Sequence, residues 1–209
     1  ESDLKIIAEY FLEVKHNLLV IPGAKISDIK RIHSHEQGLA QCRKKIIDLN
    51  KEMIISADTA GSAKHIANLN SKEDASIASE LAAKIYNLEI LEPNFQDAEN
   101  NVTRFLVMSK KLDLSQTNFD ETITTLIFTV RSIPASLYKC LGGFASNGVN
   151  ITKLESYVHP QGFDVAQFYI DFEGHPEENS VKLALEEMKF FCTKISILGV
   201  YKKSEFRKK

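Results

Sequence analysis

The fold of this chain is set by the stretch DIKRIHSHEQGLAQCRKKIIDLNKEMIISA (28–57), which has the pattern of a strand, a helix and a second strand. Short apolar runs at 28–34 and 53–57 flank a segment, 35–50, whose apolar residues recur at helical spacing. These residues predict one buried stripe: Leu39, Cys42, Ile46 and Leu49. Strands that alternate with helices favour an α/β layer with a largely parallel sheet.

The same alternation extends over the first half of the chain. We expect two extended segments within 4–20, strands at 74–79, 88–91 and 102–109, and helices at 59–70 and 80–88. Asn87 stands where a C-terminal cap would end the last of these helices. The sequence therefore predicts an α/β domain over residues 1–112.

The last third of the chain has a different rhythm. Polar, unpatterned residues at 111–120 predict a linker. We expect strands at 121–130, 151–159, 164–174 and 193–201, and helices at 134–148 and 176–191. Pro134 suits the first position of its helix, and Pro160-Gln161-Gly162 suits a turn between the two middle strands. The order β-α-β-β-α-β is that of the ferredoxin-like split unit, so 113–209 is predicted to be a second domain.

Composition is that of an ordinary globular protein. Of the 209 residues, 44% are hydrophobic and 26% are charged, and the formal net charge is −2. These values exclude a disordered chain and give no sign of a nucleic-acid partner. No apolar run reaches the roughly 18 residues that span a bilayer, and the three Cys lack a C-x-x-C spacing, which predicts reduced thiols. We therefore expect a cytoplasmic protein with no membrane and no nucleic-acid partner.

Three junctions between a strand and the following helix carry capping residues. Ser34 has Gln37 at the spacing of a capping box, Asp58 and Thr59 precede the second helix, and Ser79 precedes the third. In a parallel sheet these junctions meet at the carboxyl ends of the strands, where helix N-termini attract anions. Each junction by itself also has the composition of an ordinary helix cap.

The segment NNVTRF (100–105) places two amides, a hydroxyl and a guanidinium at the entry to an apolar strand. Arg is rarely buried unless it is paired. Arg104 therefore needs either a carboxylate of the chain, such as Asp97 or Glu99, or a carboxylate of a ligand. With a ligand, the site suits a small organic acid that has more than one carboxylate. The sequence contains no metal-ligand spacing, no phosphate-binding loop and no nucleophile elbow.

Four segments occur in the order and spacing of prephenate dehydratases: SHEQGLAQC (34–42), SADTAGSA (56–63), ASIASELAAKIYNLEIL (75–91) and NNVTRFLVMS (100–109). Two more resemble the ACT regulatory module of that family: PASLYKCLGGFASNGVNITKLES (134–156) and FYIDFEGH (168–175). The resemblance implies a two-lobed, periplasmic-binding-protein-like catalytic domain with its second lobe mostly present, followed by a ferredoxin-like βαββαβ ACT domain. It also implies a lyase of phenylalanine biosynthesis that converts prephenate to phenylpyruvate without a cofactor or metal.

The resemblance assigns roles to particular residues. In the catalytic motif, Thr103 would supply the hydroxyl, Arg104 would hold a carboxylate and Phe105 would pack against the ring. Five residues would bind the substrate: Ser34, Gln37, Thr59, Ser79 and Asn101. L-Phenylalanine would be the effector of a homodimer or homotetramer, bound by these residues: Pro134, Ala135, Ser136, Leu137, Glu155 and Ser156.

The chain departs from the family pattern at three points. Glu36 replaces a Pro of the first motif, and Tyr157-Val158 replace the Arg and Pro of the regulatory motif, so the identity and the sign of the effector stay open. The family also begins with a further stretch that supplies part of the first lobe. We therefore expect little activity from these 209 residues alone, which phenylpyruvate assays beside the complete chain would test.

Two other functions remain open at this point. A non-catalytic sensor of a small carboxylic or amino acid would need Arg104 but not Thr103, whereas an enzyme needs both. A structural protein in which Arg104 is paired within the chain would need no ligand at all. Replacing Thr103 separates the first two functions, because a sensor would keep its affinity and an enzyme would lose turnover.

Overall fold

The computed structural model describes residues 3–110, 121–158 and 166–208. By its contacts the chain divides into two compact units, one of residues 12–103 and one of residues 1–11 with 104–209. The predicted linker at 111–120 and the predicted turn at Pro160–Gly162 lie outside the described residues. The predicted domain boundary after residue 112 stays a prediction, and each unit is described by itself below.

The unit of residues 12–103 contains a five-stranded sheet in the order β4-β3-β5-β2-β6. Its strands are β2 (Asn17–Val20), β3 (Arg31–Ser34), β4 (Glu52–Ile55), β5 (Asp74–Ala78) and β6 (Glu89–Glu92). β3 runs parallel to β4 and β5, but β2 runs antiparallel to β5 and β6. The prediction of a largely parallel sheet is thus correct for one half of the sheet, the half whose strands each lead into a helix.

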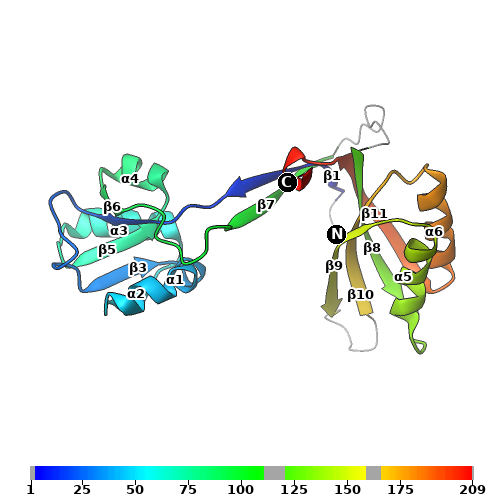
Figure 1. Ribbon diagram of the computed structural model, residues 1–209, viewed down its shortest axis with the longest axis horizontal. Coiled ribbons are helices and arrows are strands. Elements are labelled where there is room, and N and C mark those ends of the chain that lie inside the picture. The colour runs from blue at the N-terminus through cyan, green and yellow to red at the C-terminus, as the bar shows by residue number, and fades with distance from the viewer. Residues whose placement is uncertain (1–2, 111–120, 159–165, 209) are drawn as a thin grey trace. The chain divides into compact units, whose positions relative to one another are not determined.

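Helices cover both faces of this sheet (Figure 1). They are α1 (Glu36–Gln41), α2 (Arg43–Asp48), α3 (Thr59–Leu69) and α4 (Glu80–Tyr86). Side chains alternate along a strand, and Leu18 and Leu19 of β2 accordingly belong to different cores. Leu18 packs in the core that includes Ile46 of α2, and Leu19 packs with Ala63 of α3. Both leucines are fully buried.

The predicted helix over 35–50 is wrong in one respect, because it is broken at Cys42. The φ of −116° and ψ of 12° at Cys42 end α1 and start α2. The predicted capping role of Ser34 is also wrong. Its buried hydroxyl donates to the carbonyl of Ile77 on the neighbouring strand at 2.7 Å, and His35 caps α1 by accepting from the backbone N–H of Gln37 at 3.2 Å.

The other caps agree with the sequence. Asp58 accepts from the N–H of Gly61 at 2.5 Å to cap α3, and Ser79 accepts from the N–H of Ala82 at 3.2 Å to cap α4. Asn87 ends α4 in the left-handed conformation with a φ of 55°, as its position predicts.

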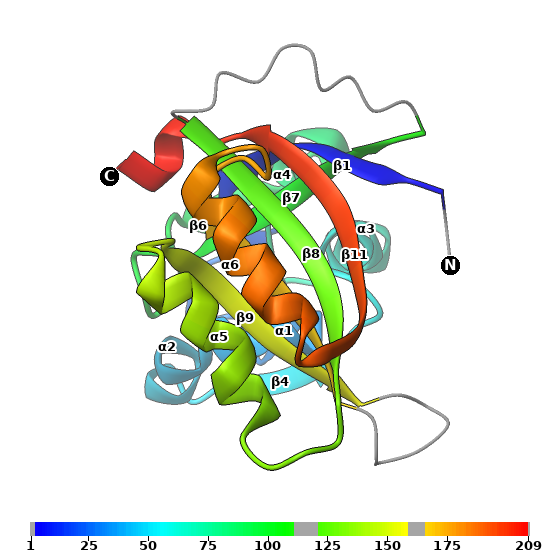
Figure 2. The same ribbon diagram turned by 90° about the vertical axis from the view of Figure 1, so that its right-hand side faces the viewer.

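The second unit contains a six-stranded sheet in the order β7-β1-β11-β8-β10-β9. Its strands are β1 (Lys5–Glu13), β7 (Val102–Ser109), β8 (Thr122–Val130), β9 (Ile151–Val158), β10 (Ala166–Glu173) and β11 (Cys192–Lys202), of which β1 and β7 begin or end in the other unit. The helices α5 (Ser136–Ser146) and α6 (Asn179–Lys189) lie side by side on one face of this sheet (Figure 2). The chain order β8-α5-β9-β10-α6-β11 with antiparallel pairing is the predicted βαββαβ arrangement.

β1 joins this arrangement as an added strand beside β11. The two strands are parallel, and Ile6 lies opposite Gly199. A Cβ on Gly199 would lie only 2.2 Å from the carbonyl oxygen of Ile6, so this close approach requires glycine. The predicted place of Pro134 at the first position of α5 is wrong, because Ala135 precedes the helix with a φ of 60° and the helix starts at Ser136. None of the helices in the described ranges is long and apolar enough to cross a membrane.

Candidate functional site

The unit of residues 12–103 carries a pocket of about 400 Å³ at the ends of its parallel strands. Its lining comes from four segments of the chain: Val14, His16, His35, Gln37, Gly38, Gln41, Ala57, Asp58, Thr59, Asn101 and Thr103. Four of the predicted site residues are therefore in one pocket: Gln37, Thr59, Asn101 and Thr103. Their roles toward a ligand stay predictions.

Two of the lining segments follow β3 and β4 at their carboxyl ends, where parallel strands place ligand sites. Gly38 of α1 lets these segments approach each other closely. A Cβ at Gly38 would lie 2.7 Å from the Ser34 hydroxyl and 3.5 Å from the methyl group of Thr59. Gly38 thus brings the first turn of α1 against the start of α3, which puts Gln37 and Thr59 on the same rim.

The third and fourth segments are joined by amide hydrogen bonds. Asn101 exchanges two hydrogen bonds with the side chain of Gln41, at 3.0 and 3.3 Å, and its Nδ2 donates to the carbonyl of Val14 at 3.2 Å. The N–H of Val14 in turn donates to the carbonyl of Asn101 at 2.8 Å. The ring of His16 bonds to Gln41 at 2.7 Å. This network fixes one wall of the pocket.

Thr103 follows Asn101 by two residues at the start of β7. Because side chains of a strand alternate, Asn101 and Thr103 project to the same side while Val102 projects to the other. The Thr103 side chain is exposed, so its hydroxyl is available to a molecule in the pocket.

Two predicted substrate-binding residues are not in this lining. Ser34 is fully buried, and its hydroxyl donates a hydrogen bond to the carbonyl of Ile77. Ser79 is occupied as the cap of α4. Ser34 thus ties β3 to β5 just before α1, whereas α4, which Ser79 caps, contributes none of the lining residues named above.

Arg104 belongs to the second unit and is paired within the chain. Its guanidinium donates to Glu9 at 2.8 Å, to Asp171, and to the hydroxyl of Tyr201 at 2.6 Å. Glu9 and Asp171 have no exposed side-chain surface, and 14% of the Arg104 side chain is exposed. Burial alone would lower the pKa of Arg104, but Tyr201, Asp171 and Glu9 raise it above its ordinary value. Of the two alternatives that the sequence left open, the structure shows the carboxylate of the chain.

The carboxylates that pair with Arg104 are distant in sequence from it. Asp97, which is close in sequence, instead accepts from the N–H groups of Lys44 and Lys45 at 2.9 and 3.3 Å and so caps α2. Phe105 is 49% exposed on β7. The sequence gives no signal for this pairing, because β1, β7 and β10 meet only in the folded sheet.

The predicted effector residues fall into two groups in the second unit. Pro134 and Ser136 line a hollow of about 370 Å³ at the start of α5, together with Arg131 and Ala166. Ala135 precedes the helix, and Leu137 packs against the core of this unit.

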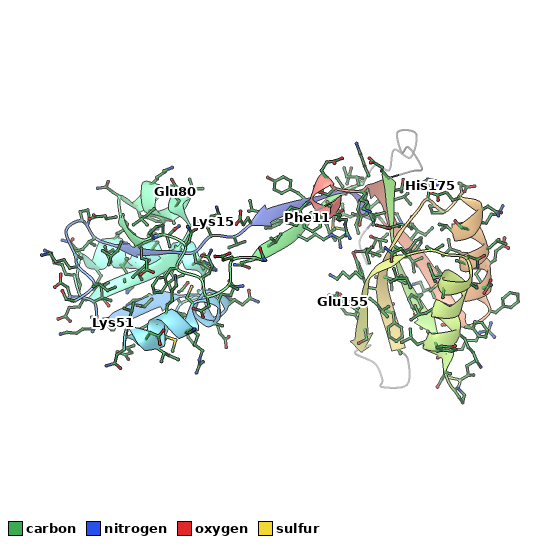
Figure 3. All side chains as sticks on the ribbon, viewed as in Figure 1. Phe11, Lys15, Lys51, Glu80, Glu155 and His175 are labelled. Atoms are coloured by element: carbon green, nitrogen blue, oxygen red, sulfur yellow. The ribbon has the colours of Figure 1, made fainter. Side chains whose placement is uncertain are left out.

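Glu155 and Ser156 lie on β9 and do not line that hollow. Glu155 is exposed (Figure 3) and accepts a hydrogen bond from the hydroxyl of Tyr157 at 3.0 Å. Ser156 lies opposite Phe168 of β10. The role of all six residues as an effector site stays a prediction.

The lining residues that the sequence pattern did not single out include His16, Gln41 and Gly38. Gln41 and Gly38 lie within the motif SHEQGLAQC (34–42), so the motif as a whole was a signal for them. His16 lies between two apolar segments and gave no signal. Among the described residues no group of three His, Cys, Asp or Glu side chains is placed to hold a metal ion.

Comparison with known proteins identifies the family. The family model for prephenate dehydratase matches residues 1–113. Over the whole chain the sequence is 44% identical to a bifunctional N-acyl-homoserine lactone acylase/prephenate dehydratase of Komagataeibacter europaeus, of which it covers 74%. It is 37% identical over 98% of its length to a bifunctional chorismate mutase/prephenate dehydratase of Aquifex aeolicus, of which it covers 55%.

A solved structure agrees with this result. The crystal structure of a prephenate dehydratase from Arthrobacter aurescens in complex with L-Phe has a TM-score of 0.85 and 29% identity, over 97% of this chain and 67% of that one. The chain belongs to the prephenate dehydratase family. It spans about half the length of several other curated relatives.

Proposed function

We propose that the protein to which this chain belongs is a prephenate dehydratase, a carbon–oxygen lyase of phenylalanine biosynthesis. Family membership supports this proposal, and one observation on the structure carries it. Thr103, the hydroxyl of the family's catalytic motif, lines the same pocket as Gln37, Thr59 and Asn101. Those three side chains supply the neutral donors and acceptors that orient a small polar acid.

The proposed reaction breaks two bonds of prephenate. The ring carboxylate leaves as CO2, its electron pair enters the ring, and the ring hydroxyl leaves with a proton as water, which gives phenylpyruvate. Aromatisation drives the reaction, so the protein has to position the substrate and assist the leaving oxygen. No step in this scheme requires a cofactor.

The residues divide between the pocket and its support. Gln37, Thr59 and Asn101 bind the substrate, and the Thr103 hydroxyl donates a hydrogen bond to the leaving oxygen, a contribution of about 3–4 kcal/mol for one well-placed donor. Ser34 ties β3 to β5 just before α1, which carries Gln37, and Ser79 caps α4. Arg104 and Phe105 belong to the other unit.

We assign Arg104 first to the buried ion pairs that hold β7 in that unit. Three of its donors are engaged by the chain. Contact of Arg104 or Phe105 with prephenate remains the prediction of the family motif.

We further propose that 1–112 belongs to a two-lobed, periplasmic-binding-protein-like catalytic domain and that 113–209 is an ACT regulatory domain. The βαββαβ order supports the second assignment. The relative from Arthrobacter aurescens was crystallised with L-Phe, which supports L-phenylalanine as the effector. A cytoplasmic homodimer or homotetramer is part of the proposal that rests on the family resemblance alone. The contacts of L-phenylalanine would come from Pro134, Ala135, Ser136 and Leu137 of one copy and from Glu155 and Ser156 of another.

The experiment that tests the enzyme proposal compares Thr103→Val with Thr103→Ser in the longest chain that the gene encodes. Val keeps the shape of Thr but lacks the hydroxyl, so we expect a loss of about 100- to 1,000-fold in kcat with little change in the affinity for a non-reacting dicarboxylate. Ser keeps the hydroxyl and should retain most of the activity. If the protein is a sensor, wild type, Thr103→Val and Thr103→Ser would all bind prephenate, and none of the three would release phenylpyruvate.

A second candidate function is hydrolysis of N-acyl-homoserine lactones. The relative from Komagataeibacter europaeus is named as an acylase as well as a prephenate dehydratase. In the pocket, the hydroxyls of Thr59 and Thr103 occur with the imidazole of His16, and acyl transfer uses a hydroxyl activated by a neighbouring base. Release of the homoserine lactone amine, measured by mass spectrometry, would support this activity. Equal release by wild type and Thr103→Val would assign it to another residue.

A further inference from the structure

The proposed reaction consumes one proton, and the pocket contains three side chains that can carry it: His16, His35 and Asp58. Asp58 is occupied as the cap of α3, since its Oδ1 accepts from the N–H of Gly61 at 2.5 Å. His35 is occupied as the cap of α1, since its Nδ1 accepts from the N–H of Gln37 at 3.2 Å. A proton placed on that nitrogen would remove the cap. His16 is the side chain of the three that has no capping role.

The hydrogen-bond network fixes which ring nitrogen of His16 carries a proton. A backbone carbonyl can only accept, so the side-chain nitrogen of Asn101 must be the atom that faces the carbonyl of Val14 at 3.2 Å. The oxygen of Asn101 therefore accepts from Nε2 of Gln41 at 3.3 Å, and Oε1 of Gln41 is the acceptor for its neighbours. His16 Nε2 lies 2.7 Å from that Oε1 and must donate to it.

With Nε2 bonded to Gln41, Nδ1 is the ring nitrogen that remains for a ligand. Among the described residues Nδ1 of His16 has no hydrogen-bond partner. The residue itself is 6% exposed, and its backbone is held by Gln96 at 3.0 Å and by the N–H of Phe95 at 2.6 Å. Gln41 thus acts as the orienting group for His16, in the way that a third group orients the base in other catalytic sites.

We propose that His16 is a catalytic residue of this pocket, and that its Nδ1 supplies the proton taken up by the departing hydroxyl of the substrate. The inference rests on the proposed dehydratase function and names a residue that this function leaves open. Thr103, on the same pocket lining, donates its hydrogen bond to the leaving oxygen and passes the proton from the imidazolium. A Thr hydroxyl has too high a pKa to be the final source of that proton.

The step balances without a further reactant. The carbon–oxygen bond of the ring hydroxyl breaks as the carbon–carbon bond to the ring carboxylate breaks, and CO2 leaves. The Thr103 hydroxyl gives its proton to the departing oxygen, which becomes water, and takes the Nδ1 proton of the imidazolium in its place. The neutral imidazole keeps the Nε2 proton that it donates to Gln41. It takes up a new proton on Nδ1 from solvent before the next turnover.

The test uses His16→Gln in the longest chain that the gene encodes, with prephenate as substrate. The amide nitrogen of Gln reproduces the Nε2 donor, so a merely structural role toward Gln41 would survive the change, whereas proton transfer would not. We expect kcat to fall by about 100- to 1,000-fold with little change in KM. The fall of kcat with rising pH should also disappear, because a proton donor acts only while it is protonated. The matched control is His65→Gln, which alters an exposed His of α3 outside the pocket lining and should leave kcat and its pH profile unchanged.

A second measurement does not depend on activity or on the folding of a variant. Nitrogen-15 NMR of the wild-type imidazoles should show neutral His16 in the Nε2–H form. Finding the Nδ1–H form, or finding kcat of His16→Gln within threefold of wild type with its pH profile intact, would overturn the assignment of His16 alone. No phenylpyruvate from the wild-type protein would overturn the dehydratase function and this inference together.

Discussion

Removal of the Arg104 guanidinium should destabilise the unit that contains residues 104–209. In Arg104→Met the side chain keeps its length, but Asp171 and Glu9 lose a partner while their side chains have no contact with solvent. Breaking a buried ion pair from one side costs about 3–5 kcal/mol. Glu9 keeps Arg207 at 2.7 Å, so we expect the lower end of that range, about 3 kcal/mol.

The assay is urea unfolding of the 209-residue chain, followed by far-ultraviolet circular dichroism. The control is Lys202→Met, because Lys202 on β11 of the same sheet is 73% exposed and lies 3.9 Å from Glu121. Exposed pairs contribute at most about 1 kcal/mol. If Arg104→Met unfolds within 1 kcal/mol of wild type while the affinity for a dicarboxylate falls at least tenfold, Arg104 serves a ligand and the structural assignment is refuted.

Three further predictions concern stability and reactivity. Arg31 and His33 hydrogen-bond the buried Asp74 and hold its pKa below the ordinary value of about 3.9. The stabilisation by Asp74 is therefore complete above the unfolded pKa and is lost as the pH falls through the folded one. Asp74→Asn should lower the free energy of unfolding by about 2–4 kcal/mol at pH 7 and make it less dependent on pH below neutrality. Urea titrations from pH 3 to 7 measure both, and an unchanged pH dependence would contradict this prediction. Gly199→Ala should lower the free energy of unfolding by at least about 2 kcal/mol in the same assay, because its Cβ would overlap the backbone of Ile6. An unchanged free energy of unfolding would mean that β1 does not pack closely against Gly199. The three buried Cys should react slowly with a thiol reagent at pH 8 until urea is added, because burial raises their pKa values; fast labelling of the native protein would contradict their burial.

Local signals in the sequence predicted the features that depend on a few neighbouring residues. Asn87 ends α4 because Asn tolerates the left-handed conformation, and Asp58 and Ser79 cap helices because their side chains reach the N–H groups three residues on. Ser34 has the same composition signal as Ser79, but the neighbouring strand offers it the carbonyl of Ile77. A cap signal therefore predicts the helix start better than it predicts which residue makes the cap.

The sequence predicted where strands lie better than it predicted whether neighbouring strands run parallel or antiparallel. The apolar pattern of β2 is the same whether it runs parallel or antiparallel to β5, because alternation of side chains does not depend on direction. The helix over 35–50 was predicted as one element because Leu39, Cys42 and Ile46 continue one stripe across the break at Cys42.

Contacts between distant segments could not be derived from the sequence. Gln37 and Thr59 share one pocket because they follow strand ends that meet at one edge. Asn101 and Thr103 line it from a distant segment, which the hydrogen bonds of Asn101 to Gln41 and Val14 hold in place. The partners of Arg104 lie 95 and 67 residues away along the chain, and no local pattern relates them. His16 also could not be assigned to the site from the sequence, because its hydrogen bonds link it to Gln41 and, through Gln41, to Asn101.

We propose that the pocket beside Thr103 decarboxylates and dehydrates prephenate. The most direct measurement is carbon-13 NMR of prephenate labelled at the ring carboxylate, mixed with the longest chain that the gene encodes. We expect labelled CO2 to appear together with one equivalent of phenylpyruvate, and Thr103→Val to slow the formation of both products to the same extent. Labelled prephenate that persists as in a protein-free control, or products that form equally fast with Thr103→Val, would contradict it.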